Sequence, residues 1–215
     1  RSRCANDVWR LSVPRLGAQQ AVTTTGAKVR PKWTEVSPQD DGQSNGQGQR
    51  IVRKWRGRVM FGYCAGLSDK GGLLIYVAGG SNGSGDLYND VWASENGGAT
   101  WLCMSREAPW SKRHSQAMCA VPGRPDYVVV AGGMGAAASI CPDVWTTDDA
   151  GGTWCMLEQP KWSETVGRYK AAFLPLPPER GASGDTARLL LLGGCFIDGG
   201  EGGYGGFERL MHDGW

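Results

Sequence analysis

Apolar and polar positions follow a short, ordered pattern in the middle of the chain. An apolar run at Ala117–Val121 is followed by a Pro-Gly turn and a second apolar run at Tyr127–Val130. Gly132-Gly133 ends the second run, and Asp143-Val144-Trp145 follows, with a glycine-rich turn before Trp154. Short apolar runs bounded by Gly and Pro are typical of strands. The order predicts four strands joined by three connections, an antiparallel meander.

The same order recurs along the chain with a period near 50 residues. Equivalent motifs lie 53 positions apart: two Gly-Gly pairs, two Asp-Val-Trp sequences and the pair Trp101 and Trp154. Three arginines, each at the head of a predicted first strand, are spaced by 55 residues: Arg58, Arg113 and Arg168. A third Asp-Val-Trp sequence stands at Asp7-Val8-Trp9. This period is typical of four-stranded propeller blades.

These residues resemble kelch-type β-propellers, such as the propeller of galactose oxidase. The shared features are an arginine at the head of the first strand, Gly-Gly closing the second, an Asp-Val-Trp third strand, and a tryptophan opening the fourth. The resemblance covers most of the chain. It implies an all-β fold of four-stranded antiparallel blades, incomplete in this chain, which holds about three blades.

Two hairpins between third and fourth strands fit the Asp-box pattern S/T-x-D/N-x-G-x-T-W. The fitting residues are Ser94, Asn96, Gly98 and Trp101 in one hairpin, and Thr147, Asp149, Gly151 and Trp154 in the other. The Asn or Asp side chain can accept backbone N–H bonds in the turn, and Gly permits a positive φ. In the sialidase-like and sortilin-like propellers that these boxes resemble, the box is structural. We expect the same role here.

The motifs divide the chain into five segments. Residues 1–36 form the last half of a preceding blade with a long hairpin insertion, and 37–54 form a flexible loop. Two blades span 55–109 and 110–162, and a partial blade spans 163–215. Because propellers close with about four or more blades, we expect further blades in additional sequence or in a partner chain.

Composition narrows the classes of function. The chain has 34 Gly and 10 Trp among 215 residues, and this tryptophan content argues against a disordered chain. No apolar stretch of about 18 residues occurs, so we expect no membrane span. The net charge of +2 gives no field that favours nucleic acid, and the short basic run at 50–58 is interpreted as a solvated stretch.

The candidate binding residues are the three strand-head arginines and the linker tryptophans Trp55, Trp110 and Trp162. Sialidases bind a substrate carboxylate with an arginine cluster in this region, and such pairing is bidentate. The favoured alternative is that each arginine hydrogen-bonds loop carbonyls of the neighbouring blade. Exposed tryptophans would stack on a sugar or bind a protein partner, whereas buried ones would pack one blade against the next. Their repetition favours packing.

Recognition is expected on one face of the propeller, where the loops between second and third strands meet the linkers between blades. In this chain that face includes 81–88, 104–112 and 134–141. These loops differ from blade to blade, as recognition segments on a repeated scaffold do. Other divergent segments, at 11–31, 38–54 and 199–206, are further candidates for partner contacts.

No catalytic or metal site is predicted. The chain has two histidines, His114 and His212, no C-x-x-C motif, and no paired carboxylates at the strand heads of the kind that glycosidases use. We therefore expect no cofactor and a non-catalytic module that binds other protein chains in a larger assembly, with a glycan as a further class of partner. The alternative is a secreted carbohydrate-binding or glycosidase-type propeller whose catalytic blades lie elsewhere.

The cysteines and one glycosylation sequon bear on the compartment. Seven cysteines are present, and Cys141 and Cys195 fall in neighbouring loops, where they could pair in an oxidising compartment. The sequon Asn82-Gly83-Ser84 and the Asp-box hairpins favour the secretory route. An organellar location is the alternative, and the sequence does not decide between them.

Overall fold

The computed structural model describes residues 4–12, 32–37, 54–68, 71–158, 167–176, 187–198 and 207–210, and gives the backbone alone for 196–198 and 207–210. These residues form strands, turns and one 3-10 turn at Ala136–Ala138, with no α-helix among them. This confirms the predicted all-β class.

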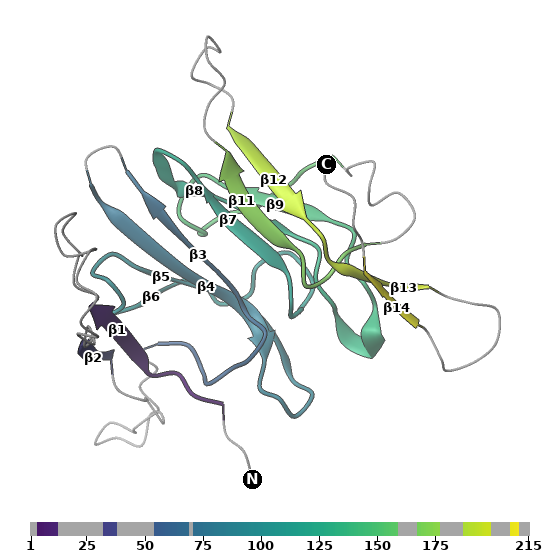
Figure 1. The fold of residues 1–215 in the computed structure, drawn as a ribbon, viewed down its shortest axis with the longest axis horizontal. Coiled ribbons are helices and arrows are strands. Elements are labelled where there is room, and N and C mark those ends of the chain that lie inside the picture. The colour runs from purple at the N-terminus through teal and green to yellow at the C-terminus, as the bar shows by residue number, and fades with distance from the viewer. Residues whose placement is uncertain are drawn as a thin grey trace, which may run out of the picture.

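Two four-stranded antiparallel sheets make up the centre of the molecule (Figure 1). The first blade has the order β3 (Gly62–Leu67), β4 (Leu73–Ser81), β5 (Leu87–Ser94) and β6 (Leu102–Ser105). The second blade has the order β7 (Ala117–Val121), β8 (Arg124–Ala131), β9 (Val144–Thr147) and β10 (Cys155–Met156). Each is the meander that the apolar pattern predicts.

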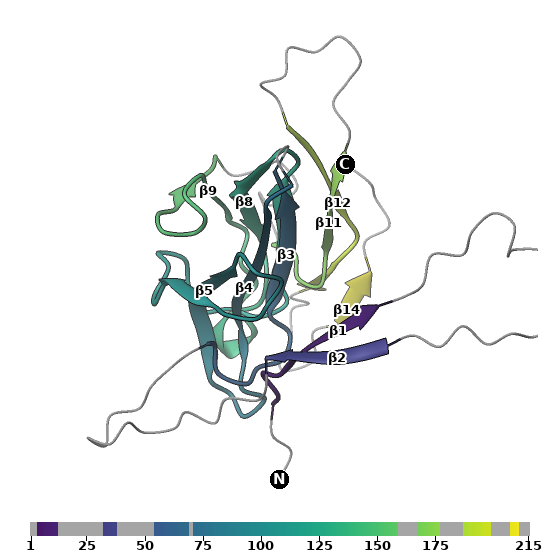
Figure 2. The same ribbon diagram turned by 90° about the vertical axis from the view of Figure 1, so that its left-hand side faces the viewer.

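Three two-stranded sheets flank the blades. Near the N-terminus, β1 (Val8–Ser12) pairs with β2 (Lys32–Ser37), and we call this pair the N-terminal hairpin. Beyond the second blade, β11 (Ala172–Leu176) pairs with β12 (Arg188–Leu192), and β13 (Cys195–Asp198) pairs with β14 (Phe207–Leu210). The N-terminal hairpin lies next to the first blade and the β11–β12 sheet next to the second (Figure 1), and Figure 2 shows both on one side of the two blades.

The first strands of neighbouring sheets lie side by side, since β7 contacts both β3 and β11. We call the edge that these three strands form the inner edge. Backbone hydrogen bonds join their heads: Ser115 N–H donates to the Met60 carbonyl at 2.7 Å, and Lys170 N–H donates to the Ser115 carbonyl at 2.8 Å. These three residues also share a left-handed φ of 53°, 56° and 57°. The inner edge is therefore built from one repeated backbone conformation, which non-glycine residues adopt three times.

Close backbone contacts at this edge require the Gly-Gly pairs. In the first blade, a Cβ on Gly79 would lie 2.8 Å from the Arg113 carbonyl oxygen, and Gly80 N–H donates to that same oxygen at 2.8 Å. In the second blade, Gly133 N–H donates to the Arg168 carbonyl. The close approach of the next blade's backbone thus leaves no room for a side chain.

The main core lies between the two blades. Tyr76, Ala78, Val91 and Ala93 of the first blade face Met118, Ala120, Val128 and Val130 of the second. Trp110, from the linker between the blades, is inserted there at 1% exposure and meets Trp154 edge to face, with ring centroids 6.1 Å apart. The blades therefore pack face to face around the linker tryptophan.

A second cluster lies on the other face of the first blade, toward the N-terminal hairpin. Trp55, from the segment before β3, packs with Val77, Trp92 and Trp101, and Val8 of the hairpin borders them. Successive residues of β5 thus face opposite ways, since Val91 packs toward the second blade and Trp92 toward the hairpin. Trp92, Trp101 and Trp154 are buried, whereas Trp145, the counterpart of Trp92, is only partly buried.

Candidate functional site

Arg58 forms a fork inside its own blade. Its Nη1 donates to Oδ1 of Asp90 at 2.6 Å and to the Gly79 carbonyl at 2.8 Å, and its Nη2 donates to Oδ2 of Asp90 at 2.8 Å. The Trp92 indole donates to the same Oδ2 at 2.7 Å. The strand-head arginine, the Gly-Gly pair and the Asp-Val-Trp motif are therefore one connected unit, in which Asp90 accepts from both a guanidinium and an indole.

Arg113 repeats this unit in the second blade. Its guanidinium donates to both carboxylate oxygens of Asp143 and to the Gly132 carbonyl, and the Trp145 indole donates to Oδ2 of Asp143 at 2.6 Å. Burial would raise the pKa of Asp143, but the hydrogen bonds from Arg113 and Trp145 outweigh it and lower this pKa below its usual range. Arg168 is also buried and donates to the Gly193 carbonyl at 3.2 Å.

The side-chain partners of these arginines differ from the prediction. We expected loop carbonyls of the neighbouring blade, but Arg58 and Arg113 bind a carbonyl and a carboxylate of their own blades. The physical reason is geometric, because the second strand pairs with both the first and the third, which brings the ends of the second and third strands near the arginine at the head of the first. The neighbouring blade contacts the backbone carbonyl of Arg113 instead. Both guanidinium groups are fully buried, so they line no open carboxylate-binding pocket.

Two of the three linker tryptophans, Trp55 and Trp110, lie in the described part of the structure, and both are buried. Trp55 is 5% exposed and meets the Trp101 ring edge to face at 4.2 Å. Trp110 is buried between the blades, with the Arg113 guanidinium 5.6 Å from the centre of its ring. Trp162 lies outside the described residues. Both described rings are thus covered by other parts of this chain.

The two hairpins that fit the Asp-box pattern have matching hydrogen bonds. Ser94 Oγ accepts from the Gly98 amide at 2.9 Å, and Thr147 Oγ1 accepts from the Gly151 amide at 3.0 Å. The tryptophan that ends each hairpin donates its indole N–H to the carbonyl of that same glycine. The polar side chains are thus used within the hairpin.

Each hairpin also fixes the spacing to the preceding sheet. A Cβ on Gly98 would lie 2.9 Å from Val8 Cγ1 of the N-terminal hairpin, and a Cβ on Gly151 would lie 2.8 Å from Val91 Cγ1 of the first blade. The valine of each Asp-Val-Trp motif therefore packs on the glycine of the following hairpin. The same contact occurs at both sheet boundaries, which indicates one repeated packing geometry.

Asp149 gives this structure a measurable dependence on pH. Burial acts to raise its pKa, but hydrogen bonds from the Thr153 amide and from the Thr147 and Thr153 hydroxyls lower it to about 2. An unfolded Asp titrates near 3.9, so the folded hairpin favours the carboxylate. Its contribution to stability is present above pH about 4 and is lost as the pH falls toward about 2. We expect Asp149→Asn to remove this part of the acid sensitivity, measured by amide exchange of residues 147–154 between pH 2 and 5.

The first hairpin supplies a natural reference for this test, because it has Asn96 at the equivalent position. Asp148→Asn is the matched control, since Asp148 is an exposed neighbour outside the hairpin's hydrogen bonds. An unchanged acid dependence of the exchange in Asp149→Asn would contradict the assignment.

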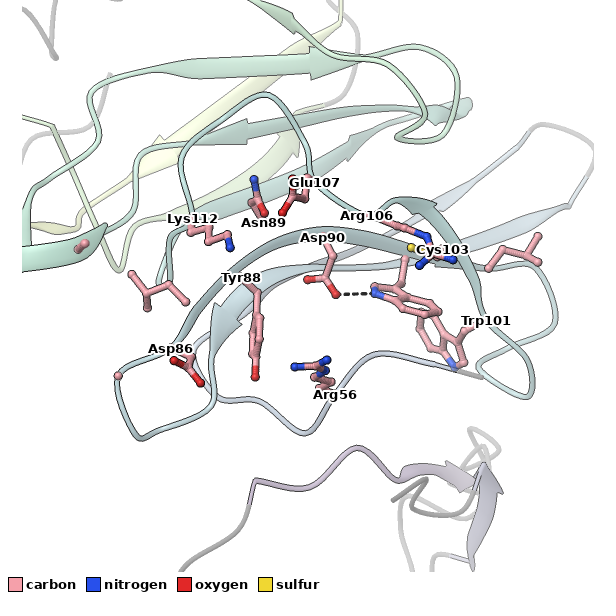
Figure 3. Close-up of a pocket in the computed structure, with 15 residues that line it drawn as sticks. Arg56, Asp86, Tyr88, Asn89, Asp90, Trp101, Cys103, Arg106, Glu107 and Lys112 are labelled. Atoms are coloured by element: carbon pink, nitrogen blue, oxygen red, sulfur yellow. Dashed lines mark hydrogen bonds between the residues drawn. The ribbon is translucent and has the colours of Figure 1, made fainter. Parts of the chain in front are cut away.

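A cleft of about 890 Å³ opens beside the first blade, where the loop before β5 meets the linker after β6. Figure 3 shows Arg56, Tyr88, Arg106 and Lys112 around Asp90, whose carboxylate binds the Trp92 indole. The cleft thus lies where the sequence predicts recognition, on the loop and linker segments 81–88 and 104–112. Ala136 from the equivalent loop of the second blade also borders it.

Two carboxylates of the cleft have partners, whereas its three exposed cations enter no ion pair among the described residues. Asp90 is neutralised by Arg58, and Asp86 accepts a hydrogen bond from Asn82 at 2.8 Å. Within the described ranges, the ion pairs are Arg58–Asp90 and Arg113–Asp143, so Arg56, Arg106 and Lys112 enter none of them. Arg56, Arg106 and Lys112 are exposed, and so is the lining carboxylate Glu107, which also enters neither ion pair. The rings of Trp92 and Trp101 border the cleft but are only 6% and 7% exposed, whereas Leu102 is 63% exposed. The cleft thus offers three cationic donors beside one apolar side chain.

The cleft thiol is not activated. Burial and the nearby Asp90 raise the pKa of Cys103, and the opposing effects of Arg106 and Arg58 are smaller. All seven cysteines are free, and Cys141 and Cys195 are both buried without a disulfide. His114 shares a hydrogen bond with the Ser115 hydroxyl, and burial followed by the charge of Lys170 lowers its pKa.

The described part of the chain holds neither a cluster of metal ligands nor a helix that could span a membrane. No three His, Cys, Asp or Glu side chains gather there as a metal would require. None of the helical structure found there has the length and apolar character needed to cross a bilayer. His212 lies outside the described residues.

Comparison with known proteins gives a fold and no family. No family model and no curated protein matches the chain. Among solved structures, the structure of YjhT matches with a TM-score of 0.51 and 14% identity, over 78% of this chain and 45% of that chain. The chain therefore spans less than half the length of that structure. At this identity the likeness concerns the fold alone, and it agrees with the blade architecture.

Proposed function

We propose that this chain is part of a kelch-type β-propeller that binds another protein without catalysis, as a recognition or structural subunit of a larger assembly. The observation that carries the proposal is the cleft beside the first blade. It holds three cations that enter no ion pair among the described residues, next to the exposed apolar side chain of Leu102. A protein segment with an acidic side chain and an adjacent apolar one fits this surface.

The division between scaffold and cleft residues supports this proposal. Repeated residues are used for internal contacts, as the Arg58–Asp90 and Arg113–Asp143 forks show. Two of the three cleft cations are not repeated: a shift of 55 positions replaces Arg56 by Ser111 and Lys112 by Gly167. A feature confined to one blade is more readily explained by recognition than by folding, because the folding requirements are the same in each blade.

The proposal is tested with a random peptide display library, using the whole chain as the target. We expect the enriched peptides to carry Asp or Glu beside an apolar residue. Arg106→Glu combined with Lys112→Glu should weaken their binding at least tenfold, which is about 1.4 kcal/mol. Arg124→Glu is the matched control, because Arg124 is an exposed arginine outside the cleft.

A glycan array with the same proteins tests the alternative. If acidic glycans bind and the double cleft variant abolishes that binding, while no peptide is enriched, the carbohydrate-binding function replaces the protein-binding one. If peptides bind the double variant as tightly as the unchanged chain, the cleft is not the binding site, and the proposal for the cleft is contradicted.

A further inference from the structure

Two asparagine–glycine pairs lie in connections of the first blade. Asn82-Gly83 follows β4, and Asn96-Gly97 lies in the hairpin between β5 and β6. Asparagine is a thermolabile residue, and it loses its side-chain ammonia most readily before glycine, whose backbone nitrogen has no Cβ beside it to block a close approach. The blade therefore presents one reactive dipeptide in two structural settings.

The backbone nitrogen that would react is held in one pair and free in the other. Gly83 N–H donates to Ser81 Oγ at 3.1 Å, and Cys4 Sγ lies 3.4 Å from the position that a Cβ on Gly83 would take. Gly97 N–H donates to no group among the described residues, and apart from its chain neighbours no atom lies within 4 Å of such a Cβ position on Gly97. The nitrogen of Gly97 can therefore turn toward the side chain of Asn96 without losing a hydrogen bond or meeting a neighbour.

The amide of Asn96 is held in a way that assists this attack. Its Oδ1 accepts from Thr100 N–H at 2.9 Å and from Ser94 Oγ at 3.1 Å, and its Nδ2 donates to Thr100 Oγ1 at 2.7 Å. Two donors on Oδ1 stabilise the negative charge that forms on this oxygen when a nucleophile adds to Cγ. Asn82 Oδ1 also accepts from two backbone N–H groups, so the glycine nitrogens distinguish the two pairs.

The equivalent hairpin of the second blade shows that aspartate fits the position of Asn96. Asp149 Oδ1 accepts from Thr153 N–H at 2.9 Å and from Thr147 Oγ1 at 2.7 Å, and its Oδ2 accepts from Thr153 Oγ1 at 2.8 Å. An oxygen in place of Asn96 Nδ2 requires only that the Thr100 hydroxyl rotates, so that it donates where it now accepts. The first hairpin can therefore hold either side chain with the same backbone.

We propose that Asn96 is a site of spontaneous deamidation that converts the first hairpin to the aspartate form of the second, whereas Asn82 is protected. The Gly97 nitrogen adds to Cγ of Asn96, its proton passes through solvent to Nδ2, and the Cγ–Nδ2 bond breaks, which releases ammonia and leaves a succinimide ring. One water molecule then adds to Cγ and breaks the new bond to nitrogen. This step restores Gly97 N–H and yields aspartate, and neither step needs an oxidant or a reductant.

The same donors select which product forms from the ring. Water that adds to the main-chain carbonyl instead would give isoaspartate, whose backbone is one carbon longer and no longer matches the hairpin. Thr100 N–H and the Ser94 hydroxyl polarise the side-chain carbonyl, so water is directed to Cγ. Asn96 does not line the cleft, and the inference therefore goes beyond the function proposed above.

The first test incubates the unmodified whole chain at mildly alkaline pH in heavy-oxygen water and measures each site by peptide mapping with mass spectrometry. We expect Asn96 to convert about tenfold faster than Asn82, the factor that one held hydrogen bond adds to a barrier. In urea the two rates should become similar, because neither nitrogen is then held. Equal rates in the folded chain, or faster conversion of Asn82, would overturn the proposal.

Two variants test the cause of the difference. Ser81→Ala removes the acceptor of Gly83 N–H, so it should speed the conversion of Asn82 and leave that of Asn96 unchanged. Asp149→Asn places an asparagine in the equivalent hairpin before Ala150 rather than glycine, and this site should convert far more slowly than Asn96. An unchanged rate at Asn82 in Ser81→Ala contradicts the role assigned to the glycine nitrogen.

The last test concerns the product. Electron-transfer fragmentation distinguishes aspartate from isoaspartate, and we expect aspartate to be the larger share at residue 96 in the folded chain and the smaller share in urea. The variant Asn96→Asp represents the product and should unfold at the same urea concentration as the unmodified chain at neutral pH. A predominance of isoaspartate in the folded chain, or a clear loss of stability in Asn96→Asp, would overturn the conversion to the aspartate form.

Discussion

Replacement of Arg113 by alanine should lower the free energy of unfolding by about 3–5 kcal/mol. The arginine side chain is fully buried, and its guanidinium donates to both oxygens of Asp143, to the Gly132 carbonyl, and to the carbonyl and hydroxyl of Ser111. Its removal leaves a half-buried carboxylate without its cation and a buried carbonyl without its donor. Urea denaturation of the whole chain measures the loss.

Arg113→Lys and Arg124→Ala are the controls for this prediction. Lysine keeps the charge but cannot form the planar fork, so we expect it to recover only part of the lost stability. Arg124 is exposed at the start of β8 and stacks on Tyr127, with its guanidinium carbon 4.9 Å from the ring centre, so Arg124→Ala should cost much less. Equal losses for Arg113→Ala and Arg124→Ala would contradict a structural role for the fork.

The period of the sequence predicted the strand order because each motif depends on local chemistry. Gly132-Gly133 marks a strand end and Asp143-Val144-Trp145 marks a third strand. Each lies 53 residues after its copy in the first blade, and this spacing predicts the positions of both blades. The hydrogen-bond partners of the arginines did not follow from spacing. Arg58 and Asp90 are 32 positions apart, and only the pairing of β4 with β3 and β5 brings them together. Sequence position alone could not decide between a carbonyl of the next blade and a carboxylate of the same one.

Other features left no signal in the sequence. Met60, Ser115 and Lys170 share a left-handed backbone, yet none of them is glycine or asparagine, so residue type could not identify them. The cleft was predicted as a face but not as a set of residues, because Arg56 and Lys112 belong to no repeat. Trp33 was missed as the counterpart of Trp101 because the long insertion after β1 hides its position in the period. The β1–β2 register reveals it.

Together these residues show why recognition and folding separate in this chain. A contact that must form at every blade boundary, such as Gly151 on Val91, repeats with the period. A contact made once with a partner has no reason to repeat, and the cleft cations Arg56 and Lys112, which we propose bind a partner, belong to no repeat. Trp9, in contrast, belongs to the repeated Asp-Val-Trp motif and is 50% exposed, whereas its counterpart Trp92 is 6% exposed.

The second large effect is expected for the linker tryptophan between the blades. Trp110→Ala should destabilise the chain by about 3–5 kcal/mol, the usual cost of truncating a buried tryptophan. The ring is 1% exposed and packs between the faces of both blades against Trp154. Its Nε1 has no hydrogen-bond partner among the described residues, so packing carries its contribution. Urea denaturation followed by circular dichroism measures the change.

Two further variants make the interpretation of Trp110 specific. Trp110→Phe keeps most of the ring contact and gives up only the unpartnered N–H, so it should lose much less than the alanine variant. Trp33→Ala, at a ring that is 58% exposed, should leave the free energy of unfolding of the isolated chain nearly unchanged. If Trp110→Ala instead kept full stability while abolishing peptide binding, Trp110 would be a recognition residue, and the packing between the blades would have to be carried by Val91, Val128 and their neighbours alone.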